Sequence, residues 1–148
     1  MTPAPILLVE DDENDIFFFT RAVQLTATDR PLQVVKDGMQ AMEYLGGKGN
    51  FADRQKYPFP GVVILDLNLP RKPGLEVLKW IRQHTEWSGI PVVVLTSSSS
   101  DLDVTVAYRL GANSYFVKPT DPDALTDLLR VFQEYWFKWG RVLPVPSV

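Results

Sequence analysis

The fold is decided by the stretch Val62-Val63-Ile64-Leu65-Asp66-Leu67-Asn68-Leu69-Pro70. Its first four residues are apolar, Asp66 follows them directly, and Pro70 ends the pattern. A continuous apolar run without polar alternation is typical of a parallel strand that is buried on both faces. Asp66 therefore stands at the carboxyl end of that strand, the edge at which open α/β sheets bind ligands. An isolated aspartate here is more often a turn or capping residue, so its role depends on the rest of the chain.

Four further apolar runs alternate with helical patterns. We expect strands over residues 6–9, 32–36, 90–95 and 113–117, and helices over residues 15–27, 39–45, 75–84, 101–110 and 121–139. Strict alternation of strand and helix predicts a doubly wound α/β fold, with one five-stranded parallel sheet and helices on both faces. Because crossovers are right-handed almost without exception, all residues that directly follow a strand should lie on one rim of the sheet.

Length and composition narrow the class of protein. The 148 residues fit one domain, and the formal net charge of −3 argues against nucleic-acid binding, which requires a basic face. The absence of cysteine excludes disulfides, thiolate metal sites and cysteine nucleophiles. The first residues include neither the basic region of a signal peptide nor an apolar run that could cross a membrane. We therefore expect a cytoplasmic protein that does not contact a membrane.

The predicted rim collects acidic side chains together with one hydroxyl and one amine. They are Glu10, Asp11 and Asp12 after the first strand, Asp66 and Asn68 after the third, Thr96 after the fourth and Lys118 after the fifth. Acidic residues also suit the N-terminus of the following helix, but one or two are enough for that purpose. Clustered carboxylates without histidine or cysteine attract a hard divalent cation, and such oxygen ligands favour Mg²⁺.

A magnesium site of this kind usually handles a phosphate group. The glycines of the chain, including Gly38, Gly46-Gly47 and Gly74, do not form either of the glycine-rich phosphate-binding motifs. What remains is an aspartate that accepts a phosphoryl group as a nucleophile. Lys118 would then balance the charge of the phosphoryl oxygens, and the Thr96 hydroxyl would donate a hydrogen bond to one of them.

Four short motifs in this order resemble the receiver domain of two-component response regulators. They are Val9-Glu10-Asp11, Ile64-Leu65-Asp66, Leu95-Thr96 and Val117-Lys118-Pro119. The resemblance covers about residues 5–135 of a single domain over residues 1–148, with an extended C-terminal helix and tail over 121–148. It implies the flavodoxin-like strand order 2-1-3-4-5.

The resemblance also implies roles for the rim residues. Asp66 would be phosphorylated by a sensor histidine kinase. Mg²⁺ would be held by Asp11, Asp66 and the backbone carbonyl of Asn68, with Glu10 acting through water. Glu10 replaces the commoner aspartate of the family, and its longer arm favours such a water-mediated contact. Asn68 and Ser98 match positions that tune the lifetime of the phosphoryl group, so this lifetime does not follow from the resemblance.

Residues of the fourth and fifth strands would change position in response to phosphorylation. Thr96 would be drawn to the phosphoryl group, and Tyr115 matches the aromatic switch that turns inward when this happens. The alternative is that Tyr115 is an ordinary aromatic residue of an edge strand. The family further implies a cis peptide bond between Lys118 and Pro119.

The signal would be passed on by contact, because we recognise no second domain. In the last helix Leu125, Leu128, Leu129, Phe132, Trp136 and Trp139 form one stripe, whereas Val131, Tyr135 and Phe137 fall outside it. This aromatic end predicts a homodimer through the last helix and a downstream protein of unknown identity. The alternative is a tail that folds back over its own core.

The connection over residues 46–61 is expected to be a surface insertion without chemistry. In this connection and in its aromatic C-terminal extension, the chain resembles the small single-domain regulators paired with bacterial phytochrome kinases.

Two other functions are compatible with parts of the pattern. An aspartate-nucleophile phosphatase of the haloacid dehalogenase type would require a second acid two residues after the nucleophile, where this chain has Asn68. An interaction module that has lost phosphorylation would not need Asp11, Asp66, Thr96 and Lys118 together. We therefore expect a signalling protein rather than an enzyme.

Overall fold

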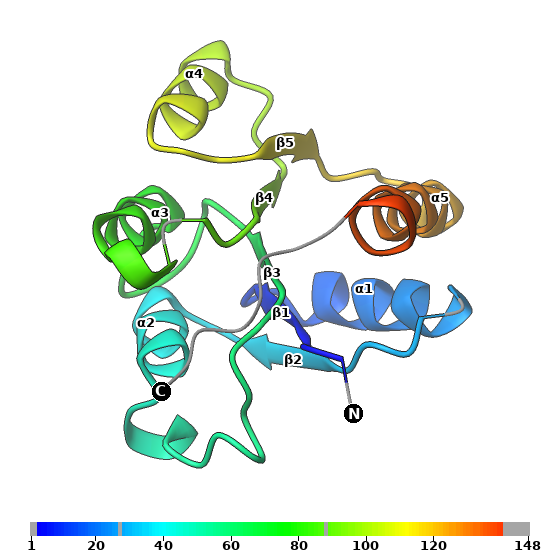
Figure 1. Ribbon diagram of the computed structural model, residues 1–148. Helices are drawn as coiled ribbons and strands as arrows, with labels where there is room; N and C mark the ends of the chain where they lie inside the picture. Colours follow the sequence, from blue (N-terminus) through cyan, green and yellow to red (C-terminus); the bar gives the residue numbers. More distant parts are fainter. Residues whose placement is uncertain (1–2, 27, 88, 141–148) are drawn as a thin grey trace.

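Five parallel strands form one sheet in the order β2-β1-β3-β4-β5 in the computed structural model, which describes residues 3–26, 28–87 and 89–140 (Figure 1). The strands are β1 (Ile6–Val9), β2 (Leu32–Val35), β3 (Val62–Leu65), β4 (Val92–Thr96) and β5 (Ser114–Val117). Every residue of β1, β3 and β4 is buried, as expected for central strands covered on both faces. The predicted fold class and strand order are confirmed.

Helices cover both faces of the sheet. They are α1 (Glu13–Leu25), α2 (Gly38–Gly46), α3 (Gly74–Gln83), α4 (Asp101–Arg109) and α5 (Pro122–Gln133), with short 3₁₀ turns η1 (Gly49–Phe51) and η2 (Thr85–Trp87) and a π-helical segment η3 (Glu134–Trp139). Helices α1 and α5 lie on one face, and α2, α3 and α4 lie on the other (Figure 1). The buried apolar side chains form two clusters accordingly, one on each side of the sheet.

The strand register places the residues that follow β1 and β3 on the same rim, next to the end of β4. Val9 is paired with Leu65, so that Glu10 and Asp66 leave the sheet side by side. The Asp66 amide donates to the Val9 carbonyl at 3.1 Å, which extends the pairing by one residue. Thr96 ends β4 opposite Val117, and Lys118 follows.

The helix that follows β3 passes unusually close to Asp66. A Cβ atom on Gly74 would lie 2.2 Å from the Asp66 carbonyl oxygen, so only glycine fits at the start of α3. On the other side of the site, α1 begins at Glu13 rather than at the predicted residue 15. Asp12 caps it, because its side chain accepts a hydrogen bond from the Asp15 amide at 2.9 Å.

Much of the connection between α2 and β3 is exposed, as expected of a surface insertion, and it is anchored to the protein by hydrogen bonds and aromatic packing. Arg54 donates to the carbonyl oxygens of Tyr44 and Leu45 at 2.7 Å and of Tyr57 at 3.1 Å. The Tyr44 hydroxyl donates to the carbonyl of Pro58 at 2.8 Å. The aromatic residues of the segment, Phe51, Tyr57 and Phe59, pack against the core. The guanidinium therefore joins the end of α2 to the segment that follows it.

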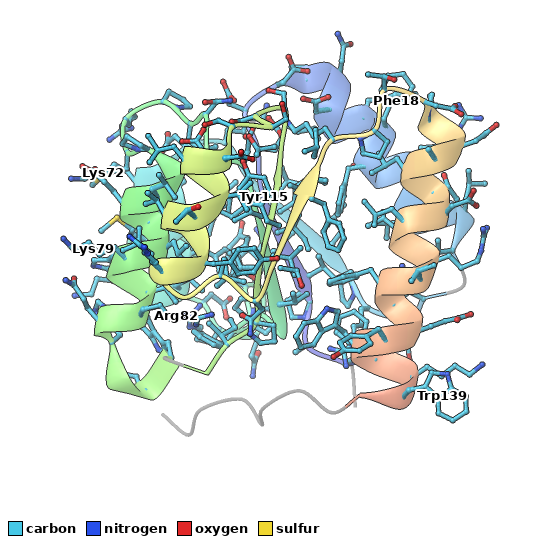
Figure 2. The ribbon with its side chains drawn as sticks, turned by 90° about the horizontal axis from the view of Figure 1, so that it is seen from above. Phe18, Lys72, Lys79, Arg82, Tyr115 and Trp139 are labelled. Carbon is cyan, nitrogen blue, oxygen red and sulfur yellow. The ribbon has the colours of Figure 1, made fainter. Side chains whose placement is uncertain are left out.

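The C-terminal end of the last helix differs from the prediction of one continuous α-helix with Trp139 on its inner stripe. Residues 134–139 are π-helical, and the wider turn changes which side chains face inward. Phe137 packs against the core, with the Arg30 guanidinium 3.8 Å from its ring centroid. Trp139 is 77% exposed and points away from the body of the protein (Figure 2). The tail over residues 141–148, which the alternative would fold over the core, lies outside the described residues.

Among the helices over the described residues, none is long and apolar enough to cross a membrane.

Candidate functional site

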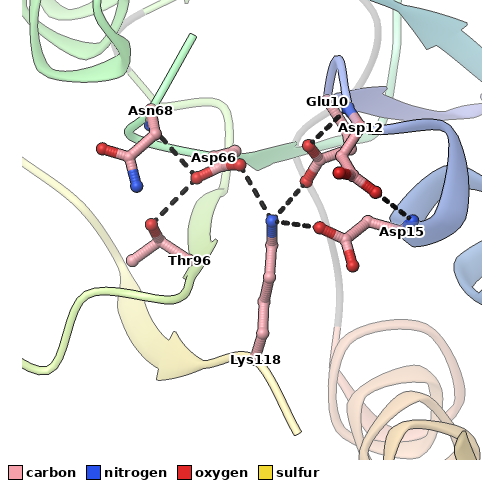
Figure 3. A network of polar contacts seen from close by, with 7 residues as sticks. All are labelled: Glu10, Asp12, Asp15, Asp66, Asn68, Thr96 and Lys118. Carbon is pink, nitrogen blue, oxygen red and sulfur yellow. Dashed lines mark hydrogen bonds and ion pairs between the residues drawn. The ribbon is translucent and has the colours of Figure 1, made fainter. Parts of the chain in front are cut away.

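Asp66 lies at the centre of the rim and is only 4% exposed. Its Oδ1 atom accepts hydrogen bonds from the Thr96 hydroxyl at 2.8 Å and from the backbone amide of Asn68 at 3.1 Å. Its Oδ2 atom lies 2.9 Å from the Lys118 ammonium (Figure 3). The predicted partners Thr96 and Lys118 thus both contact the carboxylate of Asp66.

Lys118 lies between three carboxylates that come from different elements. Its ammonium is 2.7 Å from Glu10, 2.8 Å from Asp15 and 2.9 Å from Asp66 (Figure 3). The backbone of Lys118 is also fixed, because its amide donates to the Thr96 carbonyl at 2.8 Å. An ammonium has three protons, so these three acceptors satisfy it completely.

Asp15 is the residue of this network that sequence reasoning missed. It lies in the first turn of α1, and its carboxylate reaches Lys118 across the rim. No local signal singled it out, because an acid in the first turn of a helix is expected there without any partner.

The environment of Asp66 keeps its carboxylate ionised. Burial disfavours the charged form, but hydrogen bonds from Lys118, the Asn68 amide and Thr96 outweigh it and hold the pKa of Asp66 below its ordinary value. Lys118 shows the corresponding balance: burial acts against its charge, and hydrogen bonds to Asp15, Glu10 and Asp66 raise its pKa. At neutral pH the site therefore presents a carboxylate and an ammonium in direct contact.

Glu10 behaves differently although it also contacts Lys118. Burial raises the pKa of Glu10 to about 7, against the opposing effect of the hydrogen bond from Lys118 and with a contribution from the nearby charge of Asp66. A cation placed beside Glu10 would favour its charged form.

The donor atoms at the rim fit a hard divalent cation. Glu10, Asp11 and Asp66 each offer a carboxylate oxygen, and these oxygens lie within 4.8 Å of one another. Two of the residues are buried, while Asp11 is exposed and leaves the site open to solvent. An all-oxygen set with an open side suits an ion that retains water ligands and also binds a phosphate group, as Mg²⁺ does.

The remaining predicted residues lie beside this site. The Tyr115 ring packs against the core, and its hydroxyl donates to the Ser98 carbonyl at 2.8 Å, in the loop that follows Thr96. The predicted cis bond before Pro119 is wrong, since no cis peptide bond occurs in the described part of the chain. The resemblance carried over a backbone isomer that this chain does not adopt, and trans is the more stable form of a bond to proline in the absence of specific constraints.

Comparison with known proteins identifies the family. The sequence profile of the response regulator receiver domain matches residues 6–130. The chain belongs to the response regulator receiver family. This receiver is 36% identical to response regulator Rcp1 of Synechocystis sp. over 145 residues, which cover 98% of this chain and 95% of Rcp1.

Two solved structures are similar over almost the whole receiver. The phosphorylated cyanobacterial phytochrome response regulator RcpA has a TM-score of 0.88 at 33% identity and is matched over 96% of this chain and 99% of RcpA. The Mn²⁺-bound form of Rcp1 has a TM-score of 0.84 at 34% identity, over 98% of this chain and 100% of that one.

Membership explains the chemistry gathered at the rim. Receiver domains are signalling modules that take a phosphoryl group from a histidine kinase onto an aspartate and bind a divalent metal ion. This chain is such a response regulator, and it resembles the phytochrome response regulator RcpA.

Proposed function

We propose that Asp66 is the phosphoacceptor, that a phytochrome-type sensor histidine kinase supplies the phosphoryl group, and that Mg²⁺ is the metal. The observation that carries this proposal is the set of contacts on the Asp66 carboxylate. A hydroxyl and an amide bind one oxygen, and an ammonium binds the other. These donors hold a charged nucleophile in one orientation at the open edge of the sheet.

In the transfer, an oxygen of Asp66 attacks the phosphorus atom of a phosphohistidine. The new O–P bond forms as the P–N bond breaks, and the electron pair returns to the imidazole, which takes a proton from solvent. Lys118 neutralises charge on the phosphoryl oxygens, and the Thr96 hydroxyl moves from Asp66 to one of them. Tyr115 already packs against the core and donates to the Ser98 carbonyl, so we expect the movement of Thr96 to stabilise this inward position of the ring.

Mg²⁺ would be held by Asp11, Asp66 and the backbone carbonyl of Asn68, with Glu10 acting through water. When bound, the ion would offset negative charge on the phosphoryl oxygens. The chain's own contribution is the oxygen-only donor set and the exposed side at Asp11, which leaves room for water and phosphate. Support for a phytochrome kinase comes from the similarity to RcpA, a phytochrome response regulator. The proposed place of action is the cytoplasm.

The phosphorylation proposal is tested by intact-mass measurement after incubation with Mg²⁺ and acetyl phosphate. Asp66 is expected to gain one phosphoryl group as acetate leaves, and the Asp66→Asn variant is expected to gain none. Asp127→Asn is a matched control, because Asp127 is an exposed acid that contacts Arg130 instead of the rim. Release of many equivalents of phosphate without a stable adduct would instead indicate a phosphatase. No adduct and no turnover would indicate an inert interaction module.

We also propose that the last helix mediates a homodimer and presents a surface to the downstream protein, through Trp139 of the predicted stripe and two residues outside that stripe, Val131 and Tyr135. Leu125, Leu129 and Phe132 are buried within the chain. Val131, Tyr135 and Trp139 are 65%, 67% and 77% exposed, and their spacing of four residues places them on roughly one side of the helix. Exposed apolar residues arranged in this way favour a protein contact.

The dimer is tested by sedimentation at several concentrations, with and without phosphorylation. We expect concentration-dependent association of the wild type and its loss in the double variant Tyr135→Ser, Trp139→Ser. Leu102→Ser is the control, because Leu102 is a similarly exposed apolar residue on α4. A wild type that remains monomeric in both states would contradict the dimer and leave the phosphorylation of Asp66 unaffected.

A further inference from the structure

Asp15 differs from the other two partners of Lys118 in its origin and its surroundings. Glu10 and Asp66 follow strands, and their side chains are 4% and 5% exposed. Asp15 comes from the first turn of α1, and its side chain is 43% exposed. It still approaches the Lys118 ammonium to 2.8 Å, which is between the distances of the two buried partners, 2.7 Å for Glu10 and 2.9 Å for Asp66.

The position of Asp15 is set by the packing of its helix. The Asp15 amide donates to the capping side chain of Asp12 at 2.9 Å, which fixes the first turn. The helix is held to the sheet by the buried residues Phe19, Ala22 and Val23. The carboxylate of Asp15 is therefore offered to Lys118 by a rigid element, at a helix N-terminus that also favours its negative charge.

Lys118 has open space beside it. A cavity of about 350 Å³ lies between α1 and the start of α5, and its lining includes Asp15, Lys118, Pro119 and Thr120. A lysine side chain has four flexible bonds and can enter such a space unless its ammonium is held. Asp15 is the partner that lies on the α1 side of the ammonium, opposite Asp66 (Figure 3).

The three partners also differ in what phosphorylation does to them. Asp66 loses its carboxylate charge when it becomes an acyl phosphate, and Glu10 shares its charge with the proposed metal ion. Asp15 belongs neither to the bond that forms nor to the proposed metal ligands. Its charge and its place on α1 are therefore the same before and after the transfer.

We propose that Asp15 is a positioning residue that holds the Lys118 ammonium beside Asp66 while the phosphoryl group arrives, a role that rests on the proposed phosphorylation of Asp66. Asp15 acts through Lys118 and does not touch the reacting atoms. It fixes one side of the ammonium, so that the lysine side chain does not turn into the neighbouring cavity and is already in place when the phosphoryl oxygens arrive.

The test measures the rate of phosphorylation at saturating Mg²⁺ over a range of acetyl phosphate concentrations. The Asp15→Asn variant is expected to lower the maximal rate by about threefold to tenfold, as for other directly interacting pairs. The half-saturating concentration of acetyl phosphate should stay unchanged, because the anchor acts on the lysine and not on binding of the donor. Asp15→Glu, which retains the charge on a longer arm, is expected to recover part of the rate.

Glu13→Gln is the matched control. Glu13 lies in the same turn of α1 but pairs with Lys36 at 2.6 Å, so its loss removes one negative charge without touching Lys118. The maximal phosphorylation rate of the Glu13→Gln variant should equal that of the wild type. Equal thermal midpoints of the variants would show that the fold is intact.

A double-mutant cycle makes the test specific. In a Lys118→Ala background, Asp15→Asn should cause no further loss of rate, because the residue through which Asp15 acts is gone. An equal loss in both backgrounds would overturn the positioning role, and so would an unchanged or raised maximal rate in Asp15→Asn alone. If the wild type itself gains no phosphoryl group, the proposed function fails; if it does and Asp15→Asn matches it, only the role of Asp15 fails.

Discussion

Lys118 and Arg54 are both half-buried cations with three oxygen partners, but the partners differ in kind. Arg54 binds three neutral backbone carbonyls at the end of α2 and in the segment that follows it. Lys118 binds three carboxylates, and a fourth acid, Asp11, lies beside two of them. The Arg54 network leaves no negative charge uncompensated, whereas the Lys118 network has more negative charge than one ammonium can balance.

This difference separates a structural polar network from a functional one. Arg54 supplies hydrogen bonds that the backbone would otherwise lack, so its effect should be on stability alone. The rim around Lys118 has unbalanced charge and an exposed side, so it should respond to a cation and to a phosphoryl group. Variants of the two cations allow the contrast to be measured.

The largest effect on stability is expected for Lys118→Met, which removes the charge and retains an apolar side chain of similar length. Glu10 and Asp66 would then be buried without a counterion, and the free energy of unfolding at slightly alkaline pH should fall by about 4 kcal/mol. Saturating Mg²⁺ should recover more stability in this variant than it adds to the wild type, because the ion takes over part of the compensation. Urea denaturation with and without Mg²⁺ measures both quantities. Equal gains from Mg²⁺ in the two proteins would be evidence against the charge imbalance.

A somewhat smaller effect is expected for Arg54→Ala. Three carbonyl groups lose a charged donor, so the free energy of unfolding should fall by about 3 kcal/mol. The rate of phosphorylation by acetyl phosphate should not change, and Mg²⁺ should not recover the lost stability. Arg54→Lys is the control that retains the charge without the forked geometry. A lower phosphorylation rate in Arg54→Ala would break the distinction between the two networks.

The smallest effect is a pH dependence in the Arg54 region. Burial raises the pKa of Tyr44 from 10.0 to about 12, so the folded protein retains a proton that the unfolded chain releases first. The resulting stability is fully present below pH 10 and is lost as the pH rises through about 12, by about 2.7 kcal/mol in total. Tyr44→Phe removes the titrating group, and its stability should fall less steeply over this interval. Parallel curves for the two proteins would show that Tyr44 is not responsible.

The sequence was sufficient for the features that depend on local pattern and topology. The apolar runs before Glu10 and Asp66 predict central parallel strands, and parallel strands bring their carboxyl ends to one rim. The meeting of Asp66, Thr96 and Lys118 follows from these two facts without knowledge of distances.

Features that depend on tertiary contacts were not accessible in this way. The pairing of Asp15 with Lys118 requires the relative placement of α1 and β5, which lie far apart in the sequence. The inward turn of Phe137 depends on a change from α- to π-helical hydrogen bonding, which has no simple sequence signal. The network of Arg54 similarly depends on how the chain after α2 returns to the helix end.

The location of the phosphoryl group tests the central claim most directly. The protein would be treated with acetyl phosphate in Mg²⁺ or in a chelator, digested, and analysed by peptide mass spectrometry. We expect the phosphoryl group on Asp66 and only when Mg²⁺ is present. A phosphoryl group on another residue, or equal labelling of Asp66 in the chelator, would contradict the assignment of the rim as a magnesium-dependent phosphoacceptor site.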